Sequence, residues 1–215
     1  MSLSPKMILI CGATAAGLLA GGEAFRPARA AEGDVTEWRY LIDRHGPLLI
    51  ELPDALQEAE RDDGTHIVRF RPTDGAKCEV TLEVGWSETP DPRFNEPEML
   101  RAWVQWQGEE LLDQSVESRV TLHELRGPQS SGFYFTLRDR APRKKWETFV
   151  TRGAVGVGDL RLRFTILTPQ ANTPPLRQTL KMIAGSRQGE LPPPEPAAAE
   201  APARRTKRKP GEPGG

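Results

Sequence analysis

The stretch from Cys78 to Trp86 reads CEVTLEVGW, and apolar and polar side chains alternate along it. In an extended strand successive side chains point to opposite faces, so Val80, Leu82 and Val84 share one face of this stretch. The other face carries Thr, Glu and Gly, which predicts a half-buried strand of the kind found in antiparallel sheets. Cys78 has the parity of the apolar residues, and we expect a buried, unreactive thiol there.

Two later stretches, Phe133 to Leu137 and Leu160 to Ile166, repeat this alternation and extend the expected sheet. Gly158-Asp159 comes just before the second stretch, and glycine suits the positive φ of a tight hairpin turn. We therefore expect a hairpin with the strand that ends near Val157. Two further turns are expected, Gly127-Pro128 between strands at Val120 to Arg126 and Gly132 to Asp139, and Asp63-Gly64 before a strand at Ile67 to Arg71.

Two helices are expected beside these strands. The first starts at Asn95 as N-cap, with Glu98 three residues later, and runs to about Ser115. The second follows Thr173 as N-cap, with Pro174 at its first position, and ends near Gly185. The first helix carries an apolar stripe wide enough to lie across a sheet, formed by Leu100, Trp103, Val104, Trp106 and Leu111.

Residues Ala55 to Arg61 are ambiguous. They are good helix formers, so propensity alone predicts a helix. A hairpin with the strand that follows Asp63-Gly64 would instead require this stretch to be extended.

Composition excludes one broad class of function. The chain has 215 residues, and its 29 Lys and Arg against 30 Asp and Glu leave a net charge of −1. Such a balance gives the chain as a whole no electrostatic reason to bind nucleic acid, which excludes a strongly basic nucleic-acid-binding protein. Residues 32–186 are expected to form one domain, long enough to bury about 70% of the surface that the unfolded chain exposes.

Residues 1–31 have the pattern of an export signal peptide, with Lys6 followed by an apolar stretch from Met7 to Ala20 and then small residues. The apolar stretch is shorter than the roughly 20 residues of a spanning helix, so we expect cleavage and no membrane span in the mature chain. The pattern allows cleavage after Ala24 or Ala30 and favours the second. It predicts an exported protein, periplasmic or extracellular, in which Cys78 has no second cysteine for a disulfide.

Residues 187–215 lack any apolar periodicity and are rich in Pro and Ala, which predicts a disordered tail. Its cations gather in one cluster that could contact an anionic surface through a salt-sensitive attraction: Arg204, Arg205, Lys207, Arg208 and Lys209. A tail that serves only to keep the protein soluble is the alternative. No aromatic residue lies among the cations, so we expect no specific binding of nucleic acid.

The order of the expected elements resembles the PsbP-like fold family. The resemblance runs from about Gly46 to Ser186, and its supporting details are Leu52-Pro53 at the end of the first strand, the Gly158-Asp159 hairpin and the segment from Leu180 to Ser186. It implies an α+β fold in which an antiparallel β-sheet is sandwiched by helices.

The same resemblance bears on two uncertain stretches and on function. It implies that Ala55 to Arg61 is a strand, which we adopt over the helix, and that Trp38 to Arg44 is an added helix or arm. Members of this family are mainly extrinsic subunits, assembly factors and partner-binding adaptors, so the resemblance implies binding more than catalysis. The metal and partner residues of its photosynthetic members have no match by position here.

Residues that could carry chemistry do not form a recognisable motif. His45, His66 and His123 are far apart in the sequence, without the i, i+4 pair or the paired cysteines of a typical zinc site. The Gly-x-Ser-x-Gly elbow of many hydrolases is absent, and the glycines from Gly153 to Gly158 lead into a strand instead of a phosphate-binding helix. We therefore predict no catalytic residue, no metal and no cofactor.

The function that we expect is that of an exported, non-enzymatic accessory protein of the cell envelope that binds a protein partner. The candidate partner-binding residues are the cations of the tail and a basic stretch with one aromatic residue, namely Arg140, Arg143, Lys144, Lys145 and Trp146. Two alternatives remain open. One is an envelope hydrolase with a site that the sequence hides, and the other is a carrier of a small apolar ligand with a pocket between Trp103, Trp106 and the sheet.

Overall fold

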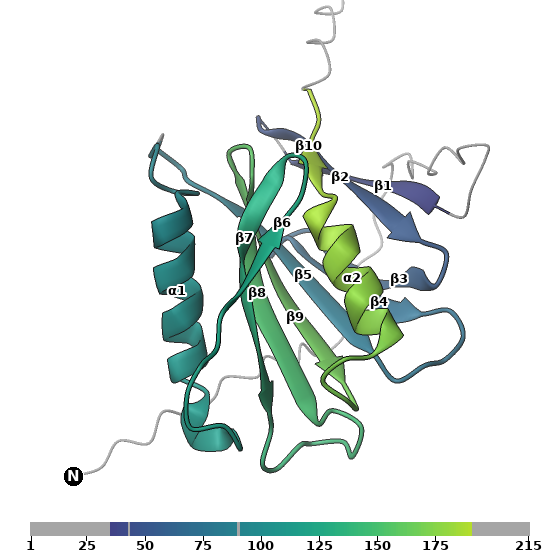
Figure 1. Ribbon diagram of the computed structural model, residues 1–215. Helices are drawn as coiled ribbons and strands as arrows, with labels where there is room; N and C mark the ends of the chain where they lie inside the picture. The colour runs from purple at the N-terminus through teal and green to yellow at the C-terminus, as the bar shows by residue number, and fades with distance from the viewer. Residues whose placement is uncertain (1–34, 43, 90, 191–215) are drawn as a thin grey trace, which may run out of the picture.

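The computed structural model describes residues 35–42, 44–89 and 91–190, which form two antiparallel sheets and two α-helices (Figure 1). The larger sheet has seven strands in the order β3-β4-β5-β9-β8-β7-β6, and the smaller sheet has three in the order β1-β2-β10. The elements are β1 Val35–Ile42, β2 Gly46–Pro53, β3 Leu56–Asp62, β4 Ile67–Pro72, β5 Glu79–Trp86, α1 Pro97–Glu109, β6 His123–Arg126, β7 Ser130–Arg138, β8 Phe149–Val157, β9 Leu160–Thr168, α2 Pro174–Ala184 and β10 Arg187–Gln188, with a short 3-10 helix at Leu112–Gln114.

The large sheet lies between two layers, as Figure 1 shows. Helix α1 packs on one face, over β7 and β8, and forms a small core with Phe135, Leu137 and Ala154. Helix α2 and the small sheet cover the other face and enclose the main core. The expected α+β fold, an antiparallel sheet between helices, is confirmed, and the small second sheet is an addition that we did not predict.

The alternation around Cys78 decides which face is which. Strand β5 pairs along its whole length with β9, so that Val80 lies opposite Ile166 and Leu82 lies opposite Phe164. These side chains are buried in the main core, together with Cys78. The intervening residues, Glu83 among them, therefore face the α1 side, and the predicted half-buried strand is confirmed.

The expected turns are also present. Val157 pairs with Leu160, and Gly158 between them has a φ of 61°, which only glycine adopts readily. Gly127 lies in the turn between β6 and β7, where its amide donates a hydrogen bond to the carbonyl oxygen of Ser130.

Strand β3 settles the ambiguous stretch at residues 55–61 in favour of a strand. It pairs with β4 at the edge of the large sheet, with a bulge between Glu58 and Glu60. Its side chains other than Leu56 are exposed, so the pattern carries little strand signal of its own. Pairing with β4 overrides the helix propensity of these residues.

The prediction of a helix or arm at Trp38 to Arg44 is wrong, because residues 35–42 form β1. This strand pairs with all of β2, and Trp38, Tyr40 and Ile42 point into the main core while Arg39 and Leu41 are exposed. Trp38, Tyr40 and Ile42 share one parity, but the apolar Leu41 falls on the other, so the alternation in the sequence is incomplete.

Helix α1 is shorter than expected, and Asn95 is not its N-cap. The cap position is Glu96, whose side chain makes no capping hydrogen bond. The Asn95 amide instead donates to the carbonyl oxygens of Gly158 and Leu160, at 3.0 and 2.8 Å, which ties the start of α1 to the β8–β9 hairpin. The long-range partners of Asn95 were hidden from a local pattern.

Helix α2 begins and ends as predicted. The Thr173 hydroxyl accepts a hydrogen bond from the Leu176 amide at 3.3 Å, and Gly185 follows the last helical residue. The chain then enters β10, where Arg187 and Gln188 pair with β2. The domain boundary that we expected after Ser186 is therefore too early. The expected signal peptide at residues 1–31 and the expected tail beyond Glu190 lie outside the described residues.

We expect Gly127→Ala to destabilise the protein, because a Cβ at this position would overlap with the carbonyl oxygen of Ala184 at the end of α2. The free energy of unfolding should fall by about 1–3 kcal/mol or more, since backbone has to move. Gly85→Ala is the matched control, because a Cβ there meets nothing within 4 Å. Urea denaturation should change by less than about 0.5 kcal/mol for the control, and equal losses for both variants would contradict the packing that we describe.

Cys78 should make stability depend on pH in the alkaline range. Burial raises the pKa of its thiol from 9.0 to about 11. The unfolded chain loses this proton at lower pH than the folded one. The stability that the protonated thiol contributes is therefore fully present below about pH 9 and is lost as the pH rises toward about 11. The free energy of unfolding should fall less steeply over this window in Cys78→Ala than in the unmodified protein. Identical slopes in urea denaturation would refute the assignment.

Candidate functional site

The predicted basic stretch forms the loop between β7 and β8. Arg140, Arg143, Lys144 and Lys145 are exposed there, and Trp146 is half-buried. The Lys144 ammonium lies 2.8 Å from the Glu147 carboxylate and 5.3 Å from the centre of the Trp146 ring. Lys144 and Trp146 therefore already have contacts within the loop. The structure thus gathers these five residues. The tail cations Arg204, Arg205, Lys207, Arg208 and Lys209 lie outside the described residues.

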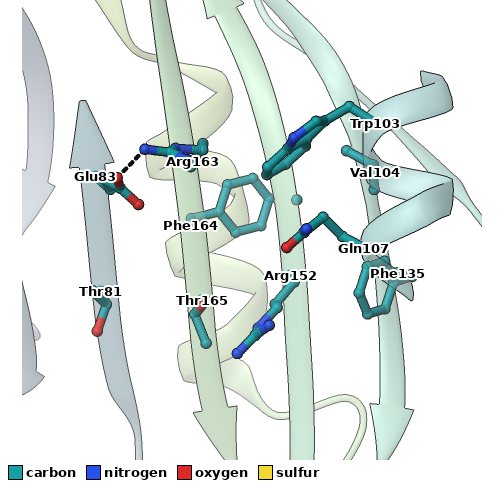
Figure 2. Close-up of a pocket in the computed structure, with 11 residues that line it drawn as sticks. Thr81, Glu83, Trp103, Val104, Gln107, Phe135, Arg152, Arg163, Phe164 and Thr165 are labelled. Carbon is teal, nitrogen blue, oxygen red and sulfur yellow. Dashed lines mark hydrogen bonds and ion pairs between the residues drawn. The ribbon is translucent and has the colours of Figure 1, made fainter. Parts of the chain in front are cut away.

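A pocket of about 230 Å³ lies on the α1 side of the large sheet, at the edge of the area that α1 covers (Figure 2). Helix α1 contacts β7 and β8 and leaves the same face of β9, β5 and β4 uncovered. The pocket lies at this border. It is lined by Thr81, Glu83, Trp103, Val104, Gln107, Phe135, Arg152, Gly153, Arg163, Phe164 and Thr165.

Strand register brings the polar side chains of this pocket together. Arg152 of β8 lies opposite Thr165 of β9, which in turn lies opposite Thr81 of β5. Arg163 and Glu83 form the adjacent row in the same way. Because alternate residues of a strand share a face, both rows point to the α1 side.

The charges in the pocket do not balance. Arg163 donates a hydrogen bond to Glu83, and two further cross-strand ion pairs lie on the same face, Arg69–Glu60 and Arg71–Glu79. Arg152 has no acidic partner in the part of the chain that the structure describes, and its Nε atom is buried without a hydrogen bond.

Burial lowers the pKa of the Arg152 guanidinium from its ordinary value. A guanidinium nonetheless keeps its charge in proteins. The pocket therefore holds one positive charge that no neighbouring carboxylate neutralises. In Figure 2 this guanidinium extends toward Thr165, away from the Arg163–Glu83 pair.

The rim of the pocket continues into an exposed apolar stripe on α1, formed by Met99, Trp103 and Trp106. Residues at i, i+4 and i+7 lie along one side of a helix. Trp103 lines the pocket, while Met99 and Trp106 are each 51% exposed. The expected pocket beside Trp103 is thus present, but its charged lining does not suit the apolar ligand that we considered, and Trp106 lies outside it.

The lining of the pocket is rich in hydrogen-bond donors. It contains no histidine, cysteine or serine, and its one carboxylate, Glu83, is engaged by Arg163. Within residues 35–42, 44–89 and 91–190, no three His, Cys, Asp or Glu side chains come together in a group that could hold a metal ion. The pocket can offer an anion a guanidinium, two hydroxyls and an amide beside an indole ring.

The histidines lie away from this pocket. His45 and His66 both pack against Trp86, with ring centroids 5.2 and 4.7 Å from it. His45 Nδ1 lies 2.6 Å from an Asp159 carboxylate oxygen, and His66 Nδ1 lies 3.0 Å from the Tyr40 hydroxyl. The ring of His123, in β6, instead stacks on the ring of Tyr134, in β7.

Sequence reasoning missed Arg152 as a site residue. Its strand reads FVTRGAVGV, in which apolar residues occur at both parities around the glycines, so no clean alternation identified its face. An arginine in an otherwise apolar strand was the available signal.

Comparisons with known proteins bear on the fold alone. No protein-family model matches the chain, and no curated protein does. A crystal structure from Bacteroides thetaiotaomicron VPI-5482 aligns at 9% identity with a TM-score of 0.36, and the match covers 66% of this chain and 45% of that one. PsbP (CyanoP) from Synechocystis sp. PCC 6803 aligns at 8% identity with a TM-score of 0.44, covering 75% of this chain and 98% of that one. The neighbours thus include a PsbP structure, while the α+β architecture itself rests on the sheet order and the helices described above, and neither alignment implies an activity or a partner.

We expect Arg152→Met to stabilise the protein, since it replaces an unneutralised, largely desolvated cation by an apolar side chain. The free energy of unfolding should rise by about 0.5–2 kcal/mol, the usual range for a single stabilising substitution. Arg163→Met is the control, because it strands Glu83 and should lower that free energy by up to about 1 kcal/mol. A loss of stability in Arg152→Met in urea denaturation would mean that Arg152 has a structural role.

Proposed function

We propose that this chain is an exported accessory protein of the cell envelope that binds an acidic protein partner through the stripe on α1. The observation that carries the proposal is the exposure of Met99 and Trp106 beside the pocket. A helix that packs only against its own domain usually turns polar residues to solvent. Large apolar side chains at such positions are typical anchors of protein interfaces, where tryptophan is enriched.

Charge supports an acidic partner. The stripe adjoins Arg152, whose charge is unneutralised, and the β7–β8 loop places exposed cations near the end of α1. The Arg140 guanidinium reaches the carbonyl oxygen of Asp113, 3.3 Å away, which fixes that end of the loop to the segment after α1. Complementary charge steers a partner to the surface and sets its orientation there.

Export and the tail belong to the same proposal. The pattern of residues 1–31 supports secretion, and no helix of the described residues is long and apolar enough to cross a membrane. We propose that the tail cations add a weak, salt-sensitive contact with an anionic surface. The proposed binding role requires no catalytic group.

We expect Trp106→Ala to weaken partner binding by roughly tenfold or more, as for an interface anchor. The mature chain is used to capture partners from envelope extract, and the affinity of each purified partner is then measured for the variants. Leu41→Ala is the matched control, because Leu41 is 64% exposed but lies on the small sheet.

The proposal fails if purified partners bind Trp106→Ala and the unmodified chain equally, or if Leu41→Ala is the variant that loses them. A full-length variant with glutamine at the five tail cations separates the contribution of the tail. A partner lost only with that variant would place recognition in the tail and contradict the role of α1.

A further inference from the structure

We propose that the pocket beside α1 is a binding site for a carboxylate group, held by the guanidinium of Arg152 and the hydroxyls of Thr81 and Thr165, with Trp103 against the apolar part of the ligand. The three polar residues form one row across β8, β9 and β5. On the helix side, Figure 2 shows the Gln107 amide nearest to Arg152, and Trp103 farther along α1, at the level of Arg163 and Phe164.

Not every arginine on this face of the sheet is paired with a carboxylate. Each of Arg69, Arg71 and Arg163 has a carboxylate partner on an adjacent strand. Arg152 and Arg161 have none, and each has a buried Nε without an acceptor within the described residues. The Arg161 guanidinium packs on the Phe94 ring, 4.0 Å from its centre, whereas Arg152 lines the pocket. A buried donor that loses water without gaining a partner costs free energy, which a bound anion would recover.

The chemistry of the lining favours a carboxylate over a phosphate. A guanidinium presents parallel N–H groups that match the two oxygens of a carboxylate. The pocket supplies a single unneutralised charge, and the Glu83 carboxylate stands in its wall. A carboxylate matches that single positive charge, whereas a phosphate group, with a charge of about −1.5 to −2, would leave excess negative charge in the pocket. The indole of Trp103 suits an organic acid with an apolar stem or ring.

The carboxylate can come from two sources, an acidic side chain of a protein partner or a free small organic acid. For the first source the inference rests on the proposed function, since the pocket adjoins the stripe of Met99, Trp103 and Trp106. For the second it stands alone. The test therefore begins with small probes, which require no partner.

The experiment titrates the mature chain with benzoate, benzamide and phenyl phosphate and follows the indole and guanidinium resonances by NMR. Benzoate should bind saturably and shift the signals of Trp103 and Arg152, while the neutral amide and the phosphate should bind at least about tenfold more weakly. Arg152→Gln should weaken benzoate binding by roughly tenfold or more, the usual scale for a hydrogen bond to a charged group. Arg152→Lys keeps the charge but loses the two parallel N–H groups, so its affinity for benzoate should lie between those of Arg152→Gln and the unmodified protein.

Arg161→Gln is the matched control. Arg161 also has a buried Nε atom without a partner, but its guanidinium lies 4.0 Å from the Phe94 ring centre, outside the pocket. This variant should bind benzoate like the unmodified protein. The inference is overturned if benzoate does not bind saturably, if Arg152→Gln binds it unchanged in a folded state, or if Arg161→Gln loses it equally.

A competition arm then identifies the source. Displacement of a captured partner by benzoate, together with loss of that partner in Arg152→Gln, assigns the carboxylate to the partner. Benzoate binding without any effect on the partner assigns the site to a free acid and leaves the proposed function standing. Partner binding that depends on Trp106 in a protein that does not bind benzoate overturns this inference alone.

Discussion

The antiparallel register of β5, β9 and β8 is the constraint on which the rest of the structure depends. It places Val80, Leu82 and their partners on one face, where α2 and the small sheet enclose them. A shift of one residue would exchange the two faces and bury Glu83 and Arg163 in the main core. The same register therefore sets both the core and the polar surface beside α1.

The pocket follows from the limited width of α1. One helix covers β7 and β8, where Phe135, Leu137 and Ala154 offer it an apolar surface. The strands beyond carry cross-strand ion pairs that are stable in water and need no cover. Arg152 lies at the border between these two regions, too covered to be fully hydrated, and Glu83 lies in the adjacent row, where Arg163 engages its carboxylate. We regard this uncompensated charge as the mark of a binding surface.

Much of the fold was predictable because its signals are local. Alternation identified β5, β7 and β9. Gly158 marked a turn that needs positive φ, and Thr173 indicated the start of α2 as its N-cap. The failures share one cause, the competition of local signals with distant partners. Asn95 has the composition of a helix cap but donates to the β8–β9 hairpin, and residues 55–61 favour a helix until β4 pairs with them. The basic loop was visible as a charge cluster, whereas Arg152 was a lone cation.

The sequence by itself determined the class of fold, the polar and apolar faces of the main strands and most of the turns, because periodicity and backbone preference act over a few residues. Only the tertiary structure decided that β1, β2 and β10 form a separate sheet and that α1 leaves half of a sheet face uncovered. It also decided which arginines find carboxylates. Arg152, Thr165 and Thr81 come from distant parts of the chain, and only strand pairing places them in one row. Burial and ion pairing are properties of that assembly, so no local pattern could reveal the charge that Arg152 leaves unneutralised.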